Sequence, residues 1–379
     1  MTKWIQGPLS AIVGLAIVAS ACTAVPDMPP ETVTTTAPSA DSRASGSQAP
    51  GEITWEVETD PLPDGRDAAD DPAIWVDPAD PARSVIIGTN KKGQDGLVVY
   101  DLAGGELQAI GGAAMNNVDL RPRVIVDGRE MILVVASTIE DRSLELFALD
   151  PGSRELSGAG ASLETGLRAS GLCLYQAADD VVHAFATGGN GDVQQWRITA
   201  GSDGLDGELV RELEFDSHLE GCVVDDVTAT FYLSEETRGI WRMSADPAAA
   251  DDRELLDTIG AAGRLEADLE GLAIAAYDGE RRFLVASSQG DDRFVVYRLN
   301  GDAAPDVVGD FTIEAPDGAD DVTHTDGIDL TLLAVGPAPF DRGMLVVQDD
   351  ENEQPDGGEA NQNFKVIPWA VVEDRLGMP

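Results

Sequence analysis

Three aspartates stand close together at the start of one apolar segment. Residues 67–75 read DAADDPAIW, so that Asp67, Asp70 and Asp71 directly precede the run PAIW. Carboxylates this close to each other repel, and burial strengthens the repulsion. Aspartates in such a place either cap a turn or a strand, or they share a bound cation.

The same arrangement, an apolar segment that opens with a polar residue, occurs five more times. The six segments are DDPAIWV, NNVDLRP, SGLCLYQ, EGCVVDD, EGLAIAA and DGIDLTL. The residues at their openings are Asp71, Asn117, Ser170, Glu220, Glu270 and Asp326. Asp70 and Asp268 stand beside two of these openings in the sequence, and Glu236 is expected to follow the outer strand of its own repeat.

Each of these segments is followed by an apolar strand, a polar turn and a second strand, with an aromatic residue near the end. The hairpins begin at Val85, Ile132, Val182, Phe231, Phe283 and Met344. No helical periodicity persists through residues 52–379. A period of about 50 residues with several strands per repeat is typical of a propeller. The sequence therefore predicts an all-β, six-bladed β-propeller, in which residues 52–59 close the ring against the last blade.

The predicted fold explains why acids recur at these positions. The first strand of each blade lies beside the central channel, so the opening residues gather at one mouth of the channel. Their ligating atoms are oxygens, and we expect no Cys or His to join them, which excludes zinc and favours calcium. A single aspartate would be a turn or strand cap, but this many acids on one axis indicate bound cations.

Two of the four lysines in the chain form one dipeptide, Lys91-Lys92, within GTNKKGQDG. A solvated turn is the simpler interpretation of this pair. The alternative is capture of an anion beside the cation cluster, because a metal ion and a lysine next to carboxylates can bind and activate a phosphate group.

The composition narrows the classes of function. The formal net charge is -44, and hydrophobic residues make up 43% of the chain, which is enough for a sizeable core. So few lysines in so acidic a chain argue against binding nucleic acid through its phosphates. An acidic chain attracts cations instead.

The first 51 residues are expected to lie outside the propeller. Residues 1–21 combine Lys3 with an apolar run and small residues before Cys22, as in a bacterial lipoprotein signal peptide with a lipidated Cys22. The alternative is an ordinary secretory signal that is cut nearby. Residues 22–51 are rich in Pro, Ser and Thr and predict a disordered tether to the propeller of residues 52–379. We expect an exported protein, lipid-anchored to the cell envelope or secreted.

Cys173 and Cys222 each lie in an apolar strand. Export permits a disulfide between them, and two buried free thiols are the equal alternative.

Taken together, these motifs resemble the β-propeller phytases, which are six-bladed, calcium-dependent phosphatases of inositol hexakisphosphate. The matching segments, in the order of the family, are DAADDPAIW, TNKKGQDGLVVYDL, NNVD, LEG, EE, ADLEGLAI, ASSQG, TDGID, QDDEN and ANQNFKVIPW. They span residues 67–369 and are specific as a set, although each is weak alone.

The resemblance implies roles for individual residues. It implies active-site calcium ligands at Asp70, Glu220, Glu236, Asp268, Glu270 and Asp326, with Asp71 and Gln289 beside them. It implies a structural calcium site at Asp320, Asp349, Glu351 and Asn352. Lys91 and Lys92 match the lysine pair of the family's phosphate site, and we expect Glu236, Lys91 and Asp70 to carry the catalysis.

Three positions depart from the family pattern. Ile139, Ser170 and Gly189 stand where the family has an arginine, a tyrosine and a lysine that bind substrate phosphates. Arg142 lies in the same turn as Ile139 and could replace the missing arginine as a substrate-binding residue. The resemblance thus implies an intact metal site and a reduced set of phosphate contacts.

The expected function is hydrolysis of phosphate monoesters of phytate, in which a calcium-activated water attacks phosphorus. Calcium would also bridge the acidic enzyme to its anionic substrate, which we expect to bind as a calcium complex to a monomeric enzyme. The membrane would be contacted only through the lipid anchor. The alternatives are a calcium-dependent hydrolase of another phosphate ester or of a lactone, and a non-catalytic binding lipoprotein.

Overall fold

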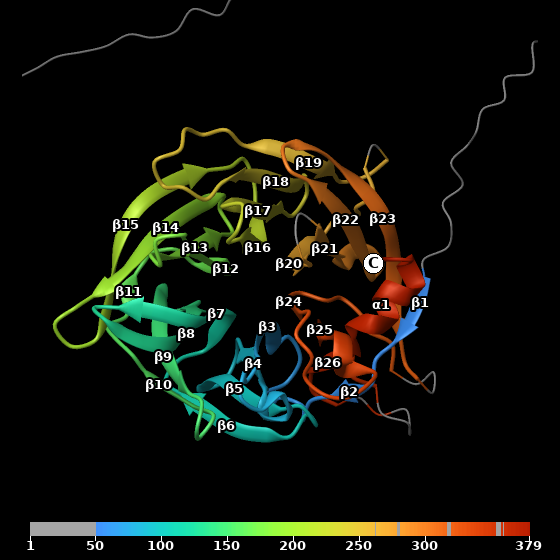
Figure 1. Ribbon diagram of the computed structural model, residues 1–379, viewed down its shortest axis with the longest axis horizontal. Helices are drawn as coiled ribbons and strands as arrows, with labels where there is room; N and C mark the ends of the chain where they lie inside the picture. Colours follow the sequence, from blue (N-terminus) through green and yellow to red (C-terminus); the bar gives the residue numbers. More distant parts are fainter. Residues whose placement is uncertain (1–50, 262, 279–280, 317–319, 354–357, 359) are drawn as a thin grey trace, which may run out of the picture. The chain divides into compact units, whose positions relative to one another are not determined.

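The computed structural model describes residues 51–261, 263–278, 281–316, 320–353, 358 and 360–379. In this part of the chain, 26 strands form six sheets that follow one another around a ring (Figure 1). This arrangement confirms the predicted all-β, six-bladed propeller. The predicted signal peptide, Cys22 and all but the last residue of the tether lie outside the described residues.

The first three blades follow in chain order, each with its innermost strand first. Blade 1 consists of β3 (Ala69–Trp75), β4 (Val85–Asn90), β5 (Asp95–Asp101) and β6 (Glu106–Gly111). Blade 2 consists of β7 (Met115–Val126), β8 (Arg129–Thr138), β9 (Ser143–Asp150) and β10 (Glu155–Gly158), with β11 (Leu163–Glu164) also paired to β9. Blade 3 consists of β12 (Ala169–Gln176), β13 (Val182–Gly188), β14 (Asp192–Ala200) and β15 (Leu205–Glu214).

The remaining blades use the same antiparallel order. Blade 4 consists of β16 (Leu219–Asp225), β17 (Thr230–Glu235), β18 (Gly239–Ser244) and β19 (Glu254–Thr258). Blade 5 consists of β20 (Leu269–Ala276), β21 (Arg282–Ser288), β22 (Arg293–Asn300) and β23 (Ala303–Glu314). Blade 6 has three strands of its own, β24 (Ile328–Thr331), β25 (Met344–Asp349) and β26 (Asn363–Pro368). In the part of the chain that the structure describes, three short 3-10 helices, Pro81–Arg83, Gln289–Asp291 and Phe340–Arg342, lie in the connections.

The N-terminal segment closes the ring, but in two pieces instead of one strand. β2 (Val57–Glu58) is the outermost strand of blade 6 and pairs with β26, as predicted. β1 (Gly51–Thr54) pairs in parallel with β23 and adds a fifth strand to blade 5. Closure therefore joins the start of the described chain to two neighbouring blades, and not only to the last one.

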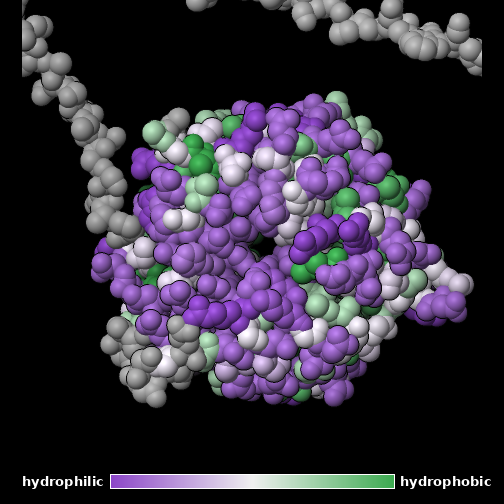
Figure 2. Space-filling model, turned by 180° about the vertical axis from the view of Figure 1, so that it is seen from behind, coloured by the Kyte–Doolittle hydropathy of each residue, from purple (hydrophilic) through white to green (hydrophobic). Residues whose placement is uncertain are grey.

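Apolar side chains fill the space between each pair of adjacent blades. In the described residues, six clusters of buried hydrophobic residues occupy the six blade-to-blade interfaces. Between blades 3 and 4, the rings of Phe185 and Phe231 stack with centroids 4.2 Å apart. Burial of these side chains from water is the main contribution that holds the blades together. The face of the propeller seen in Figure 2 is mostly hydrophilic and is hollowed near its centre.

One helix was not predicted. α1 (Trp369–Leu376) follows β26 directly and packs on the cluster between blades 5 and 6. The indole of Trp369 is fully buried, and its Nε1 donates a hydrogen bond of 2.7 Å to the Tyr277 hydroxyl of blade 5. An eight-residue helix covers barely two turns, so its periodicity is too short to detect in the sequence. In the described residues, no helix has the length and apolar character that crossing a membrane would require.

Aspartates on the innermost strands also link neighbouring blades within the channel. The backbone N–H of Ile74 donates a hydrogen bond to Asp329 (2.7 Å), that of Val118 donates to Asp71 (3.1 Å), and that of Leu174 donates to Asp119 (2.7 Å). The buried Arg121 guanidinium pairs with both Asp119 and Asp226, so it ties blade 2 to blade 4 across blade 3. Burial raises the pKa of the Asp329 carboxyl to about 7.

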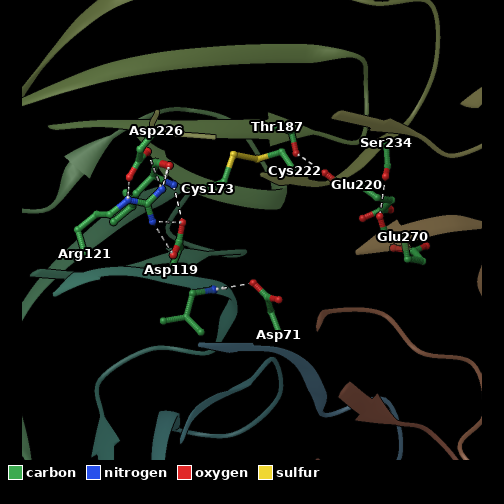
Figure 3. The surroundings of a disulfide bond; sticks show 12 residues. Asp71, Asp119, Arg121, Cys173, Thr187, Glu220, Cys222, Asp226, Ser234 and Glu270 are labelled. Carbon is green, nitrogen blue, oxygen red and sulfur yellow. Dashed lines mark hydrogen bonds and ion pairs between the residues drawn. A yellow bond between two sulfur atoms is a disulfide. The ribbon is translucent and has the colours of Figure 1, made fainter. Parts of the chain in front are cut away.

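A disulfide joins Cys173 on β12 to Cys222 on β16, with a Cα–Cα distance of 5.6 Å. Of the two alternatives that the sequence left open, the structure has the bridge. Figure 3 shows the bridge between the ion pairs of Arg121 and the carboxylates of Glu220 and Glu270. It therefore fastens the innermost strands of blades 3 and 4 close to the mouth of the channel.

Removing this bridge should destabilise the propeller. The bridge closes a loop of 49 residues, and losing a disulfide typically costs about 2–5 kcal/mol. We expect the variant Cys173→Ala/Cys222→Ala to unfold at a lower denaturant concentration than the oxidised wild type. A reductant should lower the midpoint of the wild type and leave that of the double variant unchanged. Equal midpoints for oxidised wild type and double variant would contradict a stabilising role.

Candidate metal and phosphate site

The openings of the innermost strands share one irregularity. The register of the pairing shifts at the start of β3, β7, β12, β16 and β20, where each meets the second strand of its blade. Such bulges turn a strand locally and redirect its side chains. The predicted opening residues lie at these bulges or, for Asp326, two residues before β24. The fold thus aims polar side chains from separate blades at one mouth of the channel.

Lys91 lies in the middle of the acids that gather there. Its Nζ is 2.8 Å from Asp70 Oδ2, 2.8 Å from Asp326 Oδ2 and 3.0 Å from Asp67 Oδ1. The backbone fixes this position, because Lys91 N donates to Ala68 O at 2.7 Å. Burial opposes the ammonium charge, but the carboxylates of Asp70 and Asp326 outweigh burial and raise the pKa of Lys91. The lysine is therefore a fixed cation inside the site and not a solvated turn residue.

Glu270 is the acid least compensated by its surroundings. Among the described residues, no hydrogen-bond donor or cation contacts its carboxylate. Burial raises its pKa well above the usual value, and the nearby charges of Glu220, Asp326, Asp70 and Glu236 raise it further. A half-buried carboxylate among other acids is costly unless it is protonated or binds a cation.

Two amides support the neighbouring acids. Asn117 Nδ2 donates to Asp70 Oδ1 at 3.1 Å, and Gln289 Nε2 donates to Asp326 Oδ1 at 2.6 Å. Burial still raises the pKa of Asp70 well above its usual value, despite the opposing effect of Lys91. The site thus presents oxygen donors from blades 1, 4, 5 and 6, which suit a hard cation such as Ca²⁺. Within the described residues, no three acidic, histidine or cysteine side chains are already arranged to ligate one ion, so coordination stays a prediction.

A histidine lies at this cluster, contrary to the expectation that none would. His218 Nε2 is 2.9 Å from Glu220 Oε1, and its Nδ1 is 3.3 Å from Glu236 Oε2. The hydrogen bond to Glu220 is the main reason that the pKa of His218 is raised. Sequence reasoning missed His218 because it precedes the strand opening in SHLEG, outside the repeated motif. The argument that excluded zinc from the absence of histidine was therefore wrong, although five predicted ligands at the mouth remain carboxylates.

The other predicted ligands differ in where they lie relative to the channel mouth. Glu236 follows β17, which is the second strand of blade 4 and not its outer strand as expected. Asp268 is exposed on the loop before β20. The Asp71 carboxylate accepts a hydrogen bond from Val118 N of the next blade instead of facing Lys91. Asp71 thus joins two blades within the channel, which explains why two adjacent aspartates can be buried side by side.

The predicted structural calcium site contains an internal cation. Lys365 Nζ is fully buried, contacts Asp320 Oδ2, and lies 2.7 Å from Glu58 Oε2 and 3.4 Å from Asp349 Oδ2. Burial raises the pKa of Asp349 to about 7. Apart from its ion pair with Lys365, the buried Asp349 Oδ2 atom has no hydrogen-bond donor among the described residues, so it could still ligate an ion. Of the other two residues predicted for this site, Asn352 is buried and Glu351 is exposed.

The residues expected to bind substrate phosphates are arranged around a cavity of about 690 Å³ at the mouth. Lys92 is not among the residues that line this cavity; it is exposed, with its Nζ 3.1 Å from Asp67 Oδ2. The Ser170 hydroxyl donates to Leu219 O at 2.6 Å and is therefore occupied within the protein. A Cβ on Gly189 would lie 2.9 Å from His218 Nε2, so the histidine fills part of the space beside this glycine. The cavity is lined by Asp70, Lys91, Asn116, Ile139, Arg142, Gly166, Leu167, Arg168, Ala169, Ser170, Gly189, Asn190, Asp192, His218, Glu220, Glu270 and Asp326.

Comparison with known proteins gives both a family and a relative. A sequence model of the family described as Phytase matches residues 21–378. The 3-phytase of Bacillus subtilis (strain 168) is 35% identical over 334 residues, which cover 86% of this chain and 85% of that protein. The family match extends over the propeller, including the mouth of the channel.

Two solved structures resemble the chain distantly. An auxiliary nutrient binding protein from Bacteroides thetaiotaomicron VPI-5482 aligns with a TM-score of 0.49 and 9% identity, over 84% of this chain and 75% of that one. The Cps50 (Swd1) β-propeller domain from Myceliophteria thermophila aligns with a TM-score of 0.45 and 13% identity, over 79% of this chain and 83% of that one. Likenesses at this level carry no argument about the site.

Proposed function

The chain belongs to the phytase family, and from this premise we propose that it hydrolyses the phosphate monoesters of phytate with calcium held at the channel mouth. The observation that carries the proposal is the Glu270 carboxylate, which is half-buried among four other acids without a donor in the described residues. Membership of the family supports phytate as the substrate, and the environment of Glu270 supports the binding of cations at this site. Calcium, when bound, supplies charge that holds a substrate phosphate and favours a nucleophilic water.

The chain's own residues supply the rest of the chemistry. The Lys91 ammonium is held at a fixed place by Asp70 and Asp326, so it can stabilise negative charge on the transferring phosphoryl group without reorganising. Glu220 and Glu236 are held apart by the His218 ring, which contacts both. These contacts orient both carboxylates.

A panel of substrates tests the proposed reaction. We expect the protein to release inorganic phosphate from phytate in buffer that contains calcium. Bis(p-nitrophenyl) phosphate and a γ-lactone should be hydrolysed far more slowly, because Lys91 is placed to bind a phosphate monoester. Preferred hydrolysis of the diester or of the lactone would replace the proposal by one of those activities. No turnover of any of the three would indicate a binding protein.

We also propose that the protein is exported and that Cys22 carries a lipid anchor. The support for export is the Cys173–Cys222 bridge, since disulfides persist mainly in oxidising compartments outside the cytosol. The exported enzyme would meet its substrate as a calcium complex, which lowers the repulsion from a chain of net charge -44.

Calcium at Asp320 and Asp349 should raise thermal stability. An ion that binds only the native state stabilises it by mass action, by about 2.7 kcal/mol at 100 times its dissociation constant. We expect the melting temperature to fall when a chelator is added, and the Asp349→Asn variant to lose most of this response. If the wild type melts at the same temperature with and without chelator, Lys365 alone neutralises this cluster.

A further inference from the structure

The second strand of blades 1 to 5 carries a hydroxyl side chain where it faces the bulge of the innermost strand. The five residues are Thr89, Ser137, Thr187, Ser234 and Ser287. All five side chains are buried. Buried hydroxyls need a hydrogen-bond partner, so a hydroxyl at the same place in five repeats indicates a shared contact.

Four of these hydroxyls donate to the next blade along the ring. The four hydrogen bonds, 2.6 to 2.9 Å long, run from Thr89 to Asn116 O, from Thr187 to Glu220 O, from Ser234 to Glu270 O and from Ser287 to Thr325 O. Ser137 stays within blade 2, where its hydroxyl donates to Asn117 Oδ1 at 3.4 Å. The accepting carbonyl belongs to an opening residue of the next innermost strand or to the residue directly before it.

Two of the four bonds end on predicted calcium ligands, Glu220 and Glu270. Figure 3 shows the two hydroxyls directed at the backbone of these residues. Glycines leave the room for them, since a Cβ on Gly171 would overlap both Thr187 Oγ1 and Glu220 O. A Cβ on Gly221 would lie 2.8 Å from Glu270 O. The innermost strands thus approach each other closely enough for a hydroxyl to reach the next blade.

These hydrogen bonds hold the backbone at the points where strand pairing does not. A bulge interrupts the ladder and redirects the side chain of the bulged residue. Fixing the carbonyl of that residue restricts the rotation of its backbone, and with it the direction of its side chain. Glu270 depends on this most, because no donor contacts its carboxylate among the described residues. The Glu220 carboxylate is also held by His218.

We propose that Thr187 and Ser234 are positioning residues, whose hydroxyls hold Glu220 and Glu270 so that both carboxylates face the cations at the channel mouth. This inference deepens the proposed function and rests on it. Removing a group that orients a metal ligand typically costs about 10–100-fold in metal affinity or activity. The alternative is that the hydroxyls only satisfy buried carbonyl groups and contribute to the stability of the propeller alone.

The test compares Thr187→Val and Ser234→Ala, which lack the hydroxyl, with Thr187→Ser, which keeps it. Ser84→Ala is the matched control, because Ser84 is equally buried and its hydroxyl donates to Pro81 O at 2.7 Å. Ser84 directly precedes β4, at the end of that strand away from the mouth. Calcium binding is measured by calorimetry, and Glu270→Gln identifies the binding step that belongs to the mouth. The calcium dependence of phosphate release and melting temperatures in chelator are measured in parallel.

We expect Thr187→Val and Ser234→Ala to raise the dissociation constant of this calcium step by about 10-fold or more. The calcium concentration that gives half the maximal rate should rise similarly, and Thr187→Ser should stay close to the wild type. Ser84→Ala should lower the melting temperature, as the other two hydroxyl-deficient variants do, without changing either calcium value.

Calcium values of Thr187→Val and Ser234→Ala equal to those of Ser84→Ala would overturn the inference and leave the hydroxyls a structural role only. A titration without any step that Glu270→Gln lacks would overturn both the inference and the metal site. If the wild type bound calcium at the mouth but released no phosphate, while Thr187→Val bound calcium more weakly, the proposed hydrolysis would fail and the positioning role would stand.

Discussion

Replacing Glu270 with glutamine is expected to reduce phosphate release from phytate by about 10³-fold or more, because the variant removes a charge that the cations at the mouth require. The same change should stabilise the protein in the presence of a chelator. Burial and the surrounding acids raise the pKa of Glu270 well above its usual value, so the native state holds this proton more tightly than the unfolded chain does. The free energy of unfolding therefore falls as the pH rises above the pKa that the Glu270 carboxyl has in the unfolded chain. The Glu270→Gln variant should not show this decrease.

The two readouts separate a metal site from a purely structural one. Thermal melts in chelator should give a higher melting temperature for Glu270→Gln than for the wild type at neutral pH. Glu236→Gln should also abolish phosphate release with little change in fold. Glu212→Gln, on the outermost strand of blade 3, is the control and should change neither quantity. Full activity of Glu270→Gln would show that this residue does not belong to the catalytic site. A melting temperature below that of the wild type would show that other groups of the folded protein stabilise the charged Glu270 carboxylate.

Lys91→Met should lower kcat for phytate by about 10²–10³-fold at saturating calcium, which is typical of losing one preorganised donor to transition-state charge. The structure gives the reason, since Lys91 Nζ lies 2.8 Å from both Asp70 and Asp326 at the centre of the acids. Methionine keeps most of the side-chain volume and removes only the ammonium. The measurement is steady-state phosphate release with each variant at matched free calcium.

Lys92→Met is the matched control for this prediction. Lys92 is exposed and its Nζ pairs with the exposed Asp67, so we expect a change of only a few fold, mainly in KM. Lys365 is unsuitable as a control, because its ammonium is fully buried against Asp320 and Asp349 and its loss would destabilise the fold. Equal and small effects of Lys91→Met and Lys92→Met would indicate that the lysine pair is only a solvated turn without a role in catalysis.

The repeat pattern was sufficient to predict the fold, because each blade buries the same kind of strand. The opening residues Glu220, Glu270 and Asp326 were predicted for the same reason, since a fixed position in each repeat is a fixed position around the axis, and Asp70 was predicted because it stands beside the first opening. The α1 helix and the division of the N-terminal segment between β1 and β2 could not be predicted. Both depend on packing between distant parts of the chain and leave no periodic signal.

The histidine missed at the site does not follow the repeat. His218 stands two residues before a predicted opening residue, where side chains vary from blade to blade. The contact of Asp71 with Val118 N could not be predicted, because a strand bulge decides which of two adjacent aspartates faces Lys91. The environment of Lys91 was outside the reach of sequence reasoning as well, since Asp70 is 21 and Asp326 is 235 residues away in the chain.

The most direct test of the central claim is the calcium dependence of phosphate release from phytate. The protein is stripped with a chelator, dialysed, and assayed while free calcium is raised in steps, with Glu270→Gln measured alongside. We expect no release without calcium, recovery of the full rate in the wild type as calcium is added, and no recovery in Glu270→Gln at the same concentrations. A wild-type rate in chelator equal to the rate in calcium would contradict the central claim.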